Sequence, residues 1–184
     1  GVPAEIDFDL ITMPEALTRS ASRFPDKTAI VYFGTFITYR ELENLVNRFA
    51  QALLALGVKK GDKVAMILPN IPQFIIAEYA AFRIGAVSVM NNPLYTEHEL
   101  THQLKDSDSS VMVTLDLFHP VARKLQETTG AKKAILCGLA DYLPEPLKPL
   151  FPPADVPATE GVYAFMDLIG PQPADPVPNQ ASLE

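Results

Sequence analysis

Residues 63–93 set the strongest limit on how this chain can fold. They begin with an unbroken apolar run, Val64–Leu68, which has the length of a buried strand and ends at a proline. A helix pattern that is apolar on almost every side follows over residues 71–84, with Gly85 at its end. Ala86–Met90 is a second short apolar run. A strand, a buried helix and a strand form a βαβ unit, whose sheet must be parallel and covered on both faces.

The start of the buried helix carries polar residues that suggest a capped N-terminus. Asn70 can cap the helix, with Pro72 in the first turn and Gln73 at the reciprocal capping position. The polar residues Gln73, Glu78 and Arg83 are spaced five apart, so they do not share one face of the helix.

Residues 1–60 are expected to form a lead of helix, β-hairpin and helix. Each helix is predicted from a capping box, formed by Thr12 with Glu15 and by Thr38 with Glu41. Between them, two strand-like runs flank Gly34-Thr35, which predicts a two-residue type II′ turn.

Strand and helix patterns alternate through residues 61–140. A third capping box, Thr96 with Glu99, predicts a helix, and Val111–Leu115 and Ala134–Cys137 are strand-like runs. The order βαβαβαβ predicts an α/β fold with a doubly wound, mostly parallel sheet and helices on both faces.

Residues 141–184 differ in composition, because they hold ten of the seventeen prolines. Proline cannot donate to a helix or a sheet, so an extended connection is expected there. Within it, the apolar patch Val162–Ile169 predicts a small helix that docks on another part of the fold.

Charge and cysteine content narrow the classes of function. A net charge of −7 argues against nucleic-acid binding, which needs clustered Lys and Arg. Cys137 is the only cysteine, so a disulfide framework is excluded; a cytoplasmic setting is expected, with attachment to a membrane surface as an alternative. The buried helix is too short to span a bilayer and contains two charges, so we expect no transmembrane segment.

The sequence contains no GxGxxG, GxxxxGK[ST] or GxSxG motif, and its nine glycines are scattered. It does contain His98-Glu99-Leu100-Thr101-His102, which matches the HExxH zinc-protease signature. That function would make the histidines zinc ligands and Glu99 a general base. However, Leu100 and Leu104 mark the inward face, and at about 100° per residue the histidines point away from it. A solvated helix face is expected, with a zinc hydrolase as an alternative.

Two other polar segments have a plain explanation as turns. Asp106–Ser110 resembles the start of a calcium loop, but Val111 and Leu117 stand where glycine and a bidentate Glu are needed. Asn91 and Asn92 follow a strand, where open α/β sheets bind ligands, but a turn before a proline also explains them. The sequence patterns therefore predict no catalytic, cofactor-binding or metal site.

A series of segments resembles the amino-terminal region of the acyl-adenylate-forming (AMP-binding) ligases. These are Phe36–Leu42, Gly57–Val64, Leu68–Asn70, Gly85–Val87, Asn91–Thr96 and Glu99-Leu100. Their order and spacing agree from about Met13 to Leu139. Asn92–Thr96 is most similar to the long- and medium-chain fatty-acyl-CoA synthetases.

The resemblance implies a two-step ligase that uses ATP, Mg²⁺ and coenzyme A. A carboxylate attacks the α-phosphate of ATP to give an acyl-adenylate, and the thiol of coenzyme A then displaces AMP. The family's catalytic residues lie on a phosphate loop and later segments, and none maps onto this chain. The resemblance therefore implies an incomplete part of a larger domain, ending in a Pro-rich connection before the phosphate loop.

Four properties are expected of an incomplete domain. The chain alone should be inactive and should bind none of these cofactors. A fatty-acid substrate should bind only to regions downstream of this chain. Its uncovered apolar surface predicts self-association. The alternatives are a non-catalytic α/β binding module and an adenylating relative that acts on aryl acids or loads a carrier protein.

Overall fold

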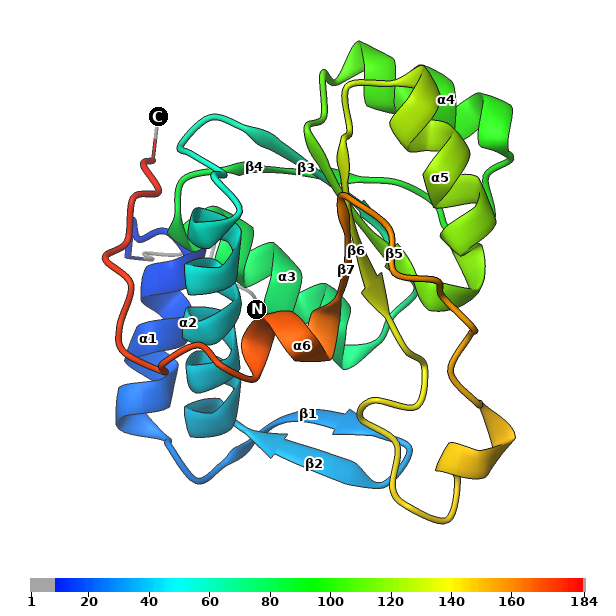
Figure 1. Cartoon of the computed structure of the whole chain (residues 1–184). Helices are drawn as coiled ribbons and strands as arrows, with labels where there is room; N and C mark the ends of the chain where they lie inside the picture. Colours follow the sequence, from blue (N-terminus) through cyan, green and yellow to red (C-terminus); the bar gives the residue numbers. More distant parts are fainter. Residues whose placement is uncertain (1–8, 184) are drawn as a thin grey trace, which may run out of the picture.

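A five-stranded, wholly parallel sheet forms the centre of the fold (Figure 1). In spatial order its strands are β4 (Val87–Met90), β3 (Lys63–Ile67), β5 (Val111–Leu115), β6 (Lys133–Cys137) and β7 (Val162–Ala164). The computed structural model describes residues 9–183, so the first eight residues of the expected lead and Glu184 lie outside it.

The order of the strands reverses once. From β3 the chain crosses to β4 on one side, returns to β5 on the other side, and continues outward to β6 and β7. This reversal places the topological switch point between β3 and β5. The predicted doubly wound fold is therefore confirmed.

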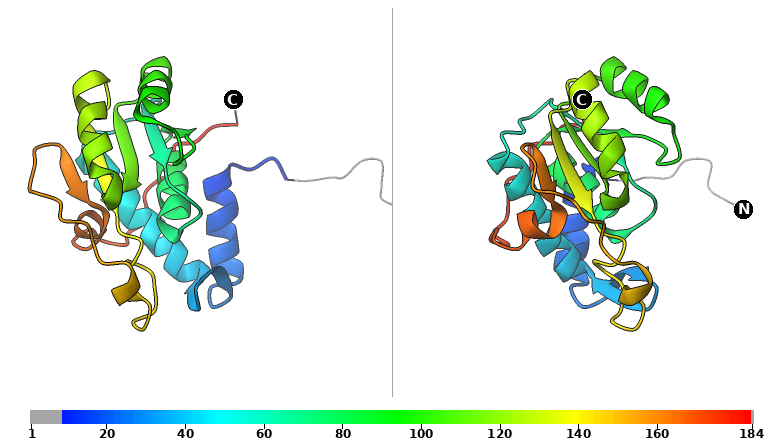
Figure 2. Two further views of the ribbon diagram at one scale, coloured as in Figure 1. Left: turned by 90° about the vertical axis from the view of Figure 1, so that its right-hand side faces the viewer. Right: turned by 45° about the vertical axis from the view of Figure 1, so that its right-hand side comes forward.

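Helices cover both faces of the sheet (Figures 1 and 2). One face carries α1 (Met13–Arg23), α2 (Tyr39–Ala55), α3 (Pro72–Arg83) and α6 (Phe165–Ile169); the other carries α4 (Glu97–Asp106) and α5 (His119–Thr128). Val64 and Met66 of β3 pack toward α3, while Ala65 and Ile67 pack toward α4. Because both faces of β3 are buried, its sequence is a continuous apolar run.

The three predicted capping boxes are all present, at the N-termini of α1, α2 and α4. The predicted cap of α3 is wrong. Its N-cap is Ile71 rather than Asn70, and no side chain caps it. Gln73 is buried, and its side-chain amide donates to the carbonyl of Gly138 in the loop after β6, at 2.8 Å. A tertiary contact therefore takes the side chain that the local pattern assigns to capping.

The predicted hairpin forms from β1 (Thr28–Tyr32) and β2 (Thr35–Thr38), but its turn lies one residue earlier. Tyr32 pairs with Thr35, so the loop is Phe33-Gly34. Both loop residues have positive φ, at 47° and 91°. Positive φ at both positions defines a type I′ turn, so the prediction of type II′ is wrong.

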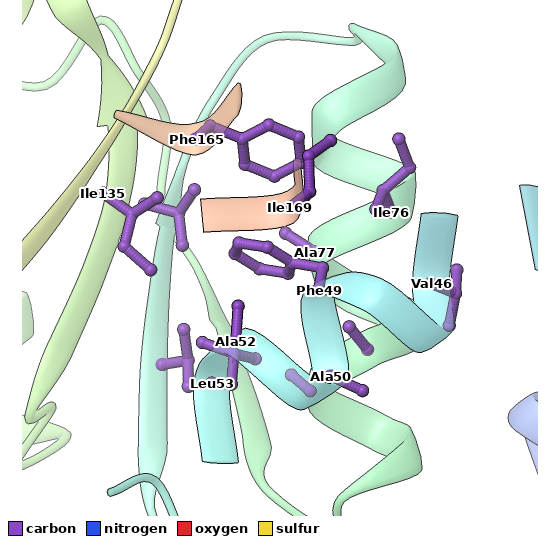
Figure 3. Close-up of a cluster of buried hydrophobic side chains, with 14 of the residues drawn as sticks. Val46, Phe49, Ala50, Ala52, Leu53, Ile76, Ala77, Ile135, Phe165 and Ile169 are labelled. Carbon is purple, nitrogen blue, oxygen red and sulfur yellow. The ribbon is translucent and has the colours of Figure 1, made fainter. Parts of the chain in front are cut away.

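Residues of the Pro-rich segment complete the core (Figure 3). Phe165 of α6 and Phe49 of α2 are fully buried, with ring centroids 4.7 Å apart. Ile76 of α3 and Ile135 of β6 belong to the same cluster. The small helix predicted within 162–169 is confirmed, but β7 before it is not predicted, because three residues are too few to show an alternating pattern.

A buried ion pair joins the helices on the α3 face. Arg83, the last residue of α3, donates to both carboxylate oxygens of Glu43, each at 2.9 Å. It also donates to Asn47 Oδ1 and to Thr18 Oγ1. Asn47 Oδ1 in turn accepts the backbone N–H of Val177, at 3.1 Å. Together these contacts link α1, α2, α3 and the carboxyl-terminal segment.

Candidate functional site

The carboxyl edge of the sheet is the candidate site, because open α/β sheets bind ligands outside the carboxyl ends of their strands. β3, β5 and β6 end there, next to the switch point, and are followed by the turn Leu68–Ile71, the 3₁₀ helix Asp116–Phe118 and the loop Gly138–Leu143. Two hollows open near these segments.

The first hollow, of about 440 Å³, is lined by three carboxylates, those of Asp116, Asp141 and Asp167. Asp141 Oδ2 accepts the side-chain amide of Gln73 and the backbone N–H of Gly138, each at 3.0 Å. Asp116 Oδ2 accepts the N–H of Ala154 at 3.0 Å. Asp116 and Asp141 thus anchor loops, and the negative charge of this hollow disfavours a phosphate group. No motif in the sequence predicts this cluster, and the polar Gln73 in a buried helix is its only local signal.

Burial raises the pKa of the Asp141 carboxyl above its ordinary value, and the charge of Asp116 raises this pKa further. The hydrogen bonds from Gln73 and Gly138 oppose this effect but do not cancel it. The folded state therefore holds the proton more tightly than the unfolded state. This tighter proton binding stabilises the folded state at acid pH. The stabilisation is lost as the pH rises above the ordinary Asp pKa of about 4.

We therefore expect Asp141→Asn to gain stability relative to the parent chain as the pH rises from acid to neutral. An asparagine oxygen can still accept both hydrogen bonds but carries no charge to desolvate. Urea unfolding across this pH range measures the difference in the free energy of unfolding. Asp155→Asn, at an exposed carboxylate, is the control. If the free energy of unfolding of Asp141→Asn instead fell relative to that of the parent chain as the pH rises, this assignment would be contradicted.

The second hollow, of about 250 Å³, is lined mainly by apolar side chains, with Asn70 and Tyr32 as its polar residues. Its walls come from the hairpin, the turn after β3 and the loop after β6, and include Phe33, Pro69, Ile71, Leu139 and Leu143. Such walls suit a hydrocarbon group, and they include no carboxylate, imidazole, amine or thiol that could activate one.

The N-terminus of α3 faces the same edge but has few free N–H groups. Pro72, at the first helical position, has no N–H. The N–H of Ile71 donates to Pro69, and the N–H of Phe74 donates to Ile71. Phosphate binding at a helix N-terminus depends on unpaired N–H groups and close backbone approach. This turn, which also lacks glycine, therefore forms no phosphate cradle.

The residues of the HExxH string lie on α4 without a metal-site geometry. His98 and His102 are exposed, whereas Leu100 is buried. Glu99 Oε2 accepts the backbone N–H and the hydroxyl of Thr96, at 2.8 and 2.7 Å. These hydrogen bonds lower the pKa of the Glu99 carboxyl, which makes it a weaker base. Among residues 9–183, no group of three or more His, Cys, Asp or Glu is placed to hold a metal ion.

The other polar candidates take part in turns. Asn92 Oδ1 accepts the N–H of Leu94 at 3.0 Å, and Asn91 Nδ2 donates to the carbonyl of Val89 at 2.8 Å. The segment Asp106–Ser110 runs from the last residue of α4 to the start of β5, with Asp108 at a φ of 53°. Both segments are therefore accounted for by local backbone geometry.

No helix within the described residues combines the length and the apolar character that a membrane crossing requires.

Comparisons with known proteins agree with this fold. The long-chain-fatty-acid–CoA ligase of Bacillus subtilis (strain 168) is 41% identical over 151 residues, which cover 82% of this chain and 27% of that protein. The protein of the same name from Salmonella typhimurium is 38% identical over 144 residues, covering 77% of this chain and 26% of that protein. The chain thus spans about a quarter of the length of these curated relatives.

Solved structures show the same architecture. A putative long-chain-fatty-acid CoA ligase from Rhodopseudomonas palustris is 26% identical with a TM-score of 0.71, and the match covers 89% of this chain and 37% of that one. The anthranilate CoA ligase AuaEII, solved with anthranoyl-AMP, shares the fold at 22% identity and a TM-score of 0.76, over 91% of this chain and 29% of that one.

A family model described as AMP-binding enzyme matches residues 17–181, a range that contains every strand of both sheets. This chain therefore belongs to the AMP-binding enzyme family.

Proposed function

We propose that this chain forms the amino-terminal scaffold of an ATP-dependent long-chain fatty acid–CoA ligase. The observation that carries this proposal is the 41% identity to the Bacillus subtilis ligase over 82% of the chain. In the proposed reaction a fatty-acid carboxylate attacks the α-phosphate of ATP, and pyrophosphate leaves. The thiol of coenzyme A then attacks the acyl-adenylate, and AMP leaves as the thioester forms. ATP, Mg²⁺ and coenzyme A are thus the cofactors of the complete enzyme.

The role of these residues in that enzyme is structural. Of the described residues, those up to 60 supply α1, the hairpin and α2, those from 61 to 140 supply four strands of the central sheet with α3, α4 and α5, and those after 140 add β7 and α6. The carboxyl edge provides an apolar hollow and a carboxylate-lined hollow but no phosphate cradle. We infer that the groups that contact ATP and coenzyme A lie on other residues of the longer protein. The buried Cys137 is compatible with a cytoplasmic location.

A chimera tests the scaffold role. The 151 residues that match the Bacillus subtilis ligase are grafted in place of their counterparts in that enzyme. Pyrophosphate release with a long-chain fatty acid reports the first step, and acyl-CoA formation reports the second. We expect both activities to persist, because the grafted part supplies scaffold and no reacting group. A chimera that folds, as judged by thermal unfolding, but releases no pyrophosphate would overturn the proposal.

The isolated chain provides the complementary measurement. Isothermal titration with ATP and Mg²⁺ should give no tight binding, because few N–H groups are free at the start of α3 and the turn before it has no glycine. Micromolar ATP binding would show instead that the chain itself holds the nucleotide site. In the complete gene product, the same assays with short, medium and long fatty acids and with aryl acids identify the substrate class.

A further inference from the structure

A cavity of about 80 Å³, the α4/α5 cavity, lies between the central sheet and helices α4 and α5. Its inner walls are made by residues that are at most 4% exposed: Ile67, Leu100, Met112, Thr114, Ala122 and Leu125. Ile67 of β3 pairs with Thr114 of β5, and these are the two strands that flank the topological switch point. The cavity shares no lining residue with the two hollows of the candidate site, so it is a separate space in the core.

The inner walls of the α4/α5 cavity offer few partners to a water molecule. The only polar side chain among them is that of Thr114, and its hydroxyl already donates to the carbonyl of Ile67 at 3.3 Å. A buried water makes about three hydrogen bonds, and apolar cavities that cannot supply them stay dry. An empty cavity also leaves its wall atoms without dispersion contacts on one side. The cavity therefore favours an uncharged ligand that has no hydrogen-bonding group.

The other four lining residues stand on the solvent side of the cavity. Tyr95 is 39% exposed, and Pro93, Phe118 and Val121 are partly exposed. Pro93 and Tyr95 lie in the connection from β4 to α4, whereas Phe118 and Val121 lie where the chain enters α5. A ligand therefore reaches the cavity between these two segments.

The volume of the cavity limits the size of its ligand. An engineered protein cavity of about 150 Å³ binds benzene, and the α4/α5 cavity has roughly half that volume. It therefore suits xenon or a short alkyl group, but neither an aromatic ring nor a length of polypeptide.

We propose that the α4/α5 cavity is a binding site for a small apolar molecule, no larger than a short alkyl group. All ten lining residues belong to this chain and none is charged, so the site is complete without another segment. A ligand that binds the folded chain alone stabilises the folded state by mass action. The site goes beyond the ligase reaction and does not depend on it.

Xenon titration of the full chain, followed by methyl NMR, tests this site. We expect saturable shifts in the methyl signals of Ile67, Met112 and Leu125, which line the cavity. Ala122→Val places a larger side chain at the cavity wall. It should raise the dissociation constant for xenon about tenfold or more, because the added atoms occupy the space of the ligand. The matched control is Ala55→Val, which makes the same substitution at an exposed residue of α2 and should leave xenon binding unchanged.

Thermal unfolding provides a second readout. Ala122→Val fills empty space, so its unfolding temperature should stay close to that of the parent chain. Ala80→Val, at a fully buried residue of α3 in the main core cluster, should lower the unfolding temperature by overpacking. An Ala122→Val chain that fails to fold would show that this position has no free space, and would overturn the proposal. So would a parent chain without saturable xenon shifts, or an Ala122→Val chain that binds xenon as well as the parent.

Crystals of the complete gene product under xenon pressure distinguish a free ligand from a segment of the longer protein. We expect xenon in the α4/α5 cavity, in contact with Ile67 and Leu125. A side chain from another part of the longer protein seated in this cavity would overturn the proposal.

Discussion

Replacing Glu43 by alanine is expected to lower the free energy of unfolding by about 3–5 kcal/mol. The Arg83 side chain is only 3% exposed and that of Glu43 is 16% exposed. Removing the carboxylate leaves a buried guanidinium without its counter-ion, and the two hydrogen bonds at 2.9 Å are lost with it. Urea unfolding followed by circular dichroism measures the change.

A surface ion pair provides the control for this effect. Arg40 and Asp26 are also 2.9 Å apart, but their side chains are 60% and 84% exposed. Solvent screens such a pair, so Asp26→Ala should cost less than about 1 kcal/mol. Equal losses for Glu43→Ala and Asp26→Ala would show that the Arg83 pair is not buried in solution.

The double variant Glu43→Ala with Arg83→Met separates the charge from the packing. Removing both charges takes away the desolvation cost, and methionine fills much of the space of the arginine stem. We expect the double variant to be more stable than Glu43→Ala alone. A double variant that is less stable would show that the hydrogen bonds of Arg83 to Thr18 and Asn47 matter more than its charge.

Replacing Phe165 by alanine is expected to cost about 3–5 kcal/mol of unfolding free energy. The ring is fully buried, and its centroid lies 4.7 Å from that of Phe49. Alanine would leave a cavity between α2, α3 and β6, which close packing around Ile76 and Ile135 prevents from collapsing (Figure 3). The same urea experiment gives the value.

Phe36→Ala is the matched control, because Phe36 lies on the hairpin and is 64% exposed. Phe36→Ala should change the free energy of unfolding by no more than about 0.5 kcal/mol, as for most surface substitutions. The contrast decides whether the Pro-rich segment is part of the cooperative core. Equal, small losses at both positions would mean that α6 is not docked on α2 in solution.

The Pro-rich segment, residues 141–184, is the part of the fold that is predicted least well from the sequence. Proline content predicts an extended connection, and residues 171–181 indeed contain no helix or strand. The partners of β7 cannot be predicted, because its place in the sheet comes from pairing with β6. Residues this far apart in sequence show no shared local pattern.

At the candidate site, too, some features can be predicted from the local sequence and others depend on contacts between distant residues. The sequence alone excludes the known phosphate-loop motifs, because each depends on glycines at fixed spacing. The carboxylate-lined hollow cannot be predicted from the sequence, because Asp116, Asp141 and Gln73 lie on three different segments. Their contact depends on the parallel pairing of β3, β5 and β6, which brings the carboxyl ends of those strands to one edge.

The sequence by itself determined the elements whose cause is local. Three capping boxes and the apolar run of β3 each depend on residues a few positions apart, and all are present in the structure. The tertiary structure decided the rest. Gln73 bonds to Gly138 instead of capping α3, the pairing of Tyr32 with Thr35 sets the turn, and Phe165 packs on Phe49. In each case a contact between distant residues outweighs a weak local preference, because burial and satisfied hydrogen bonds contribute more free energy than propensity does.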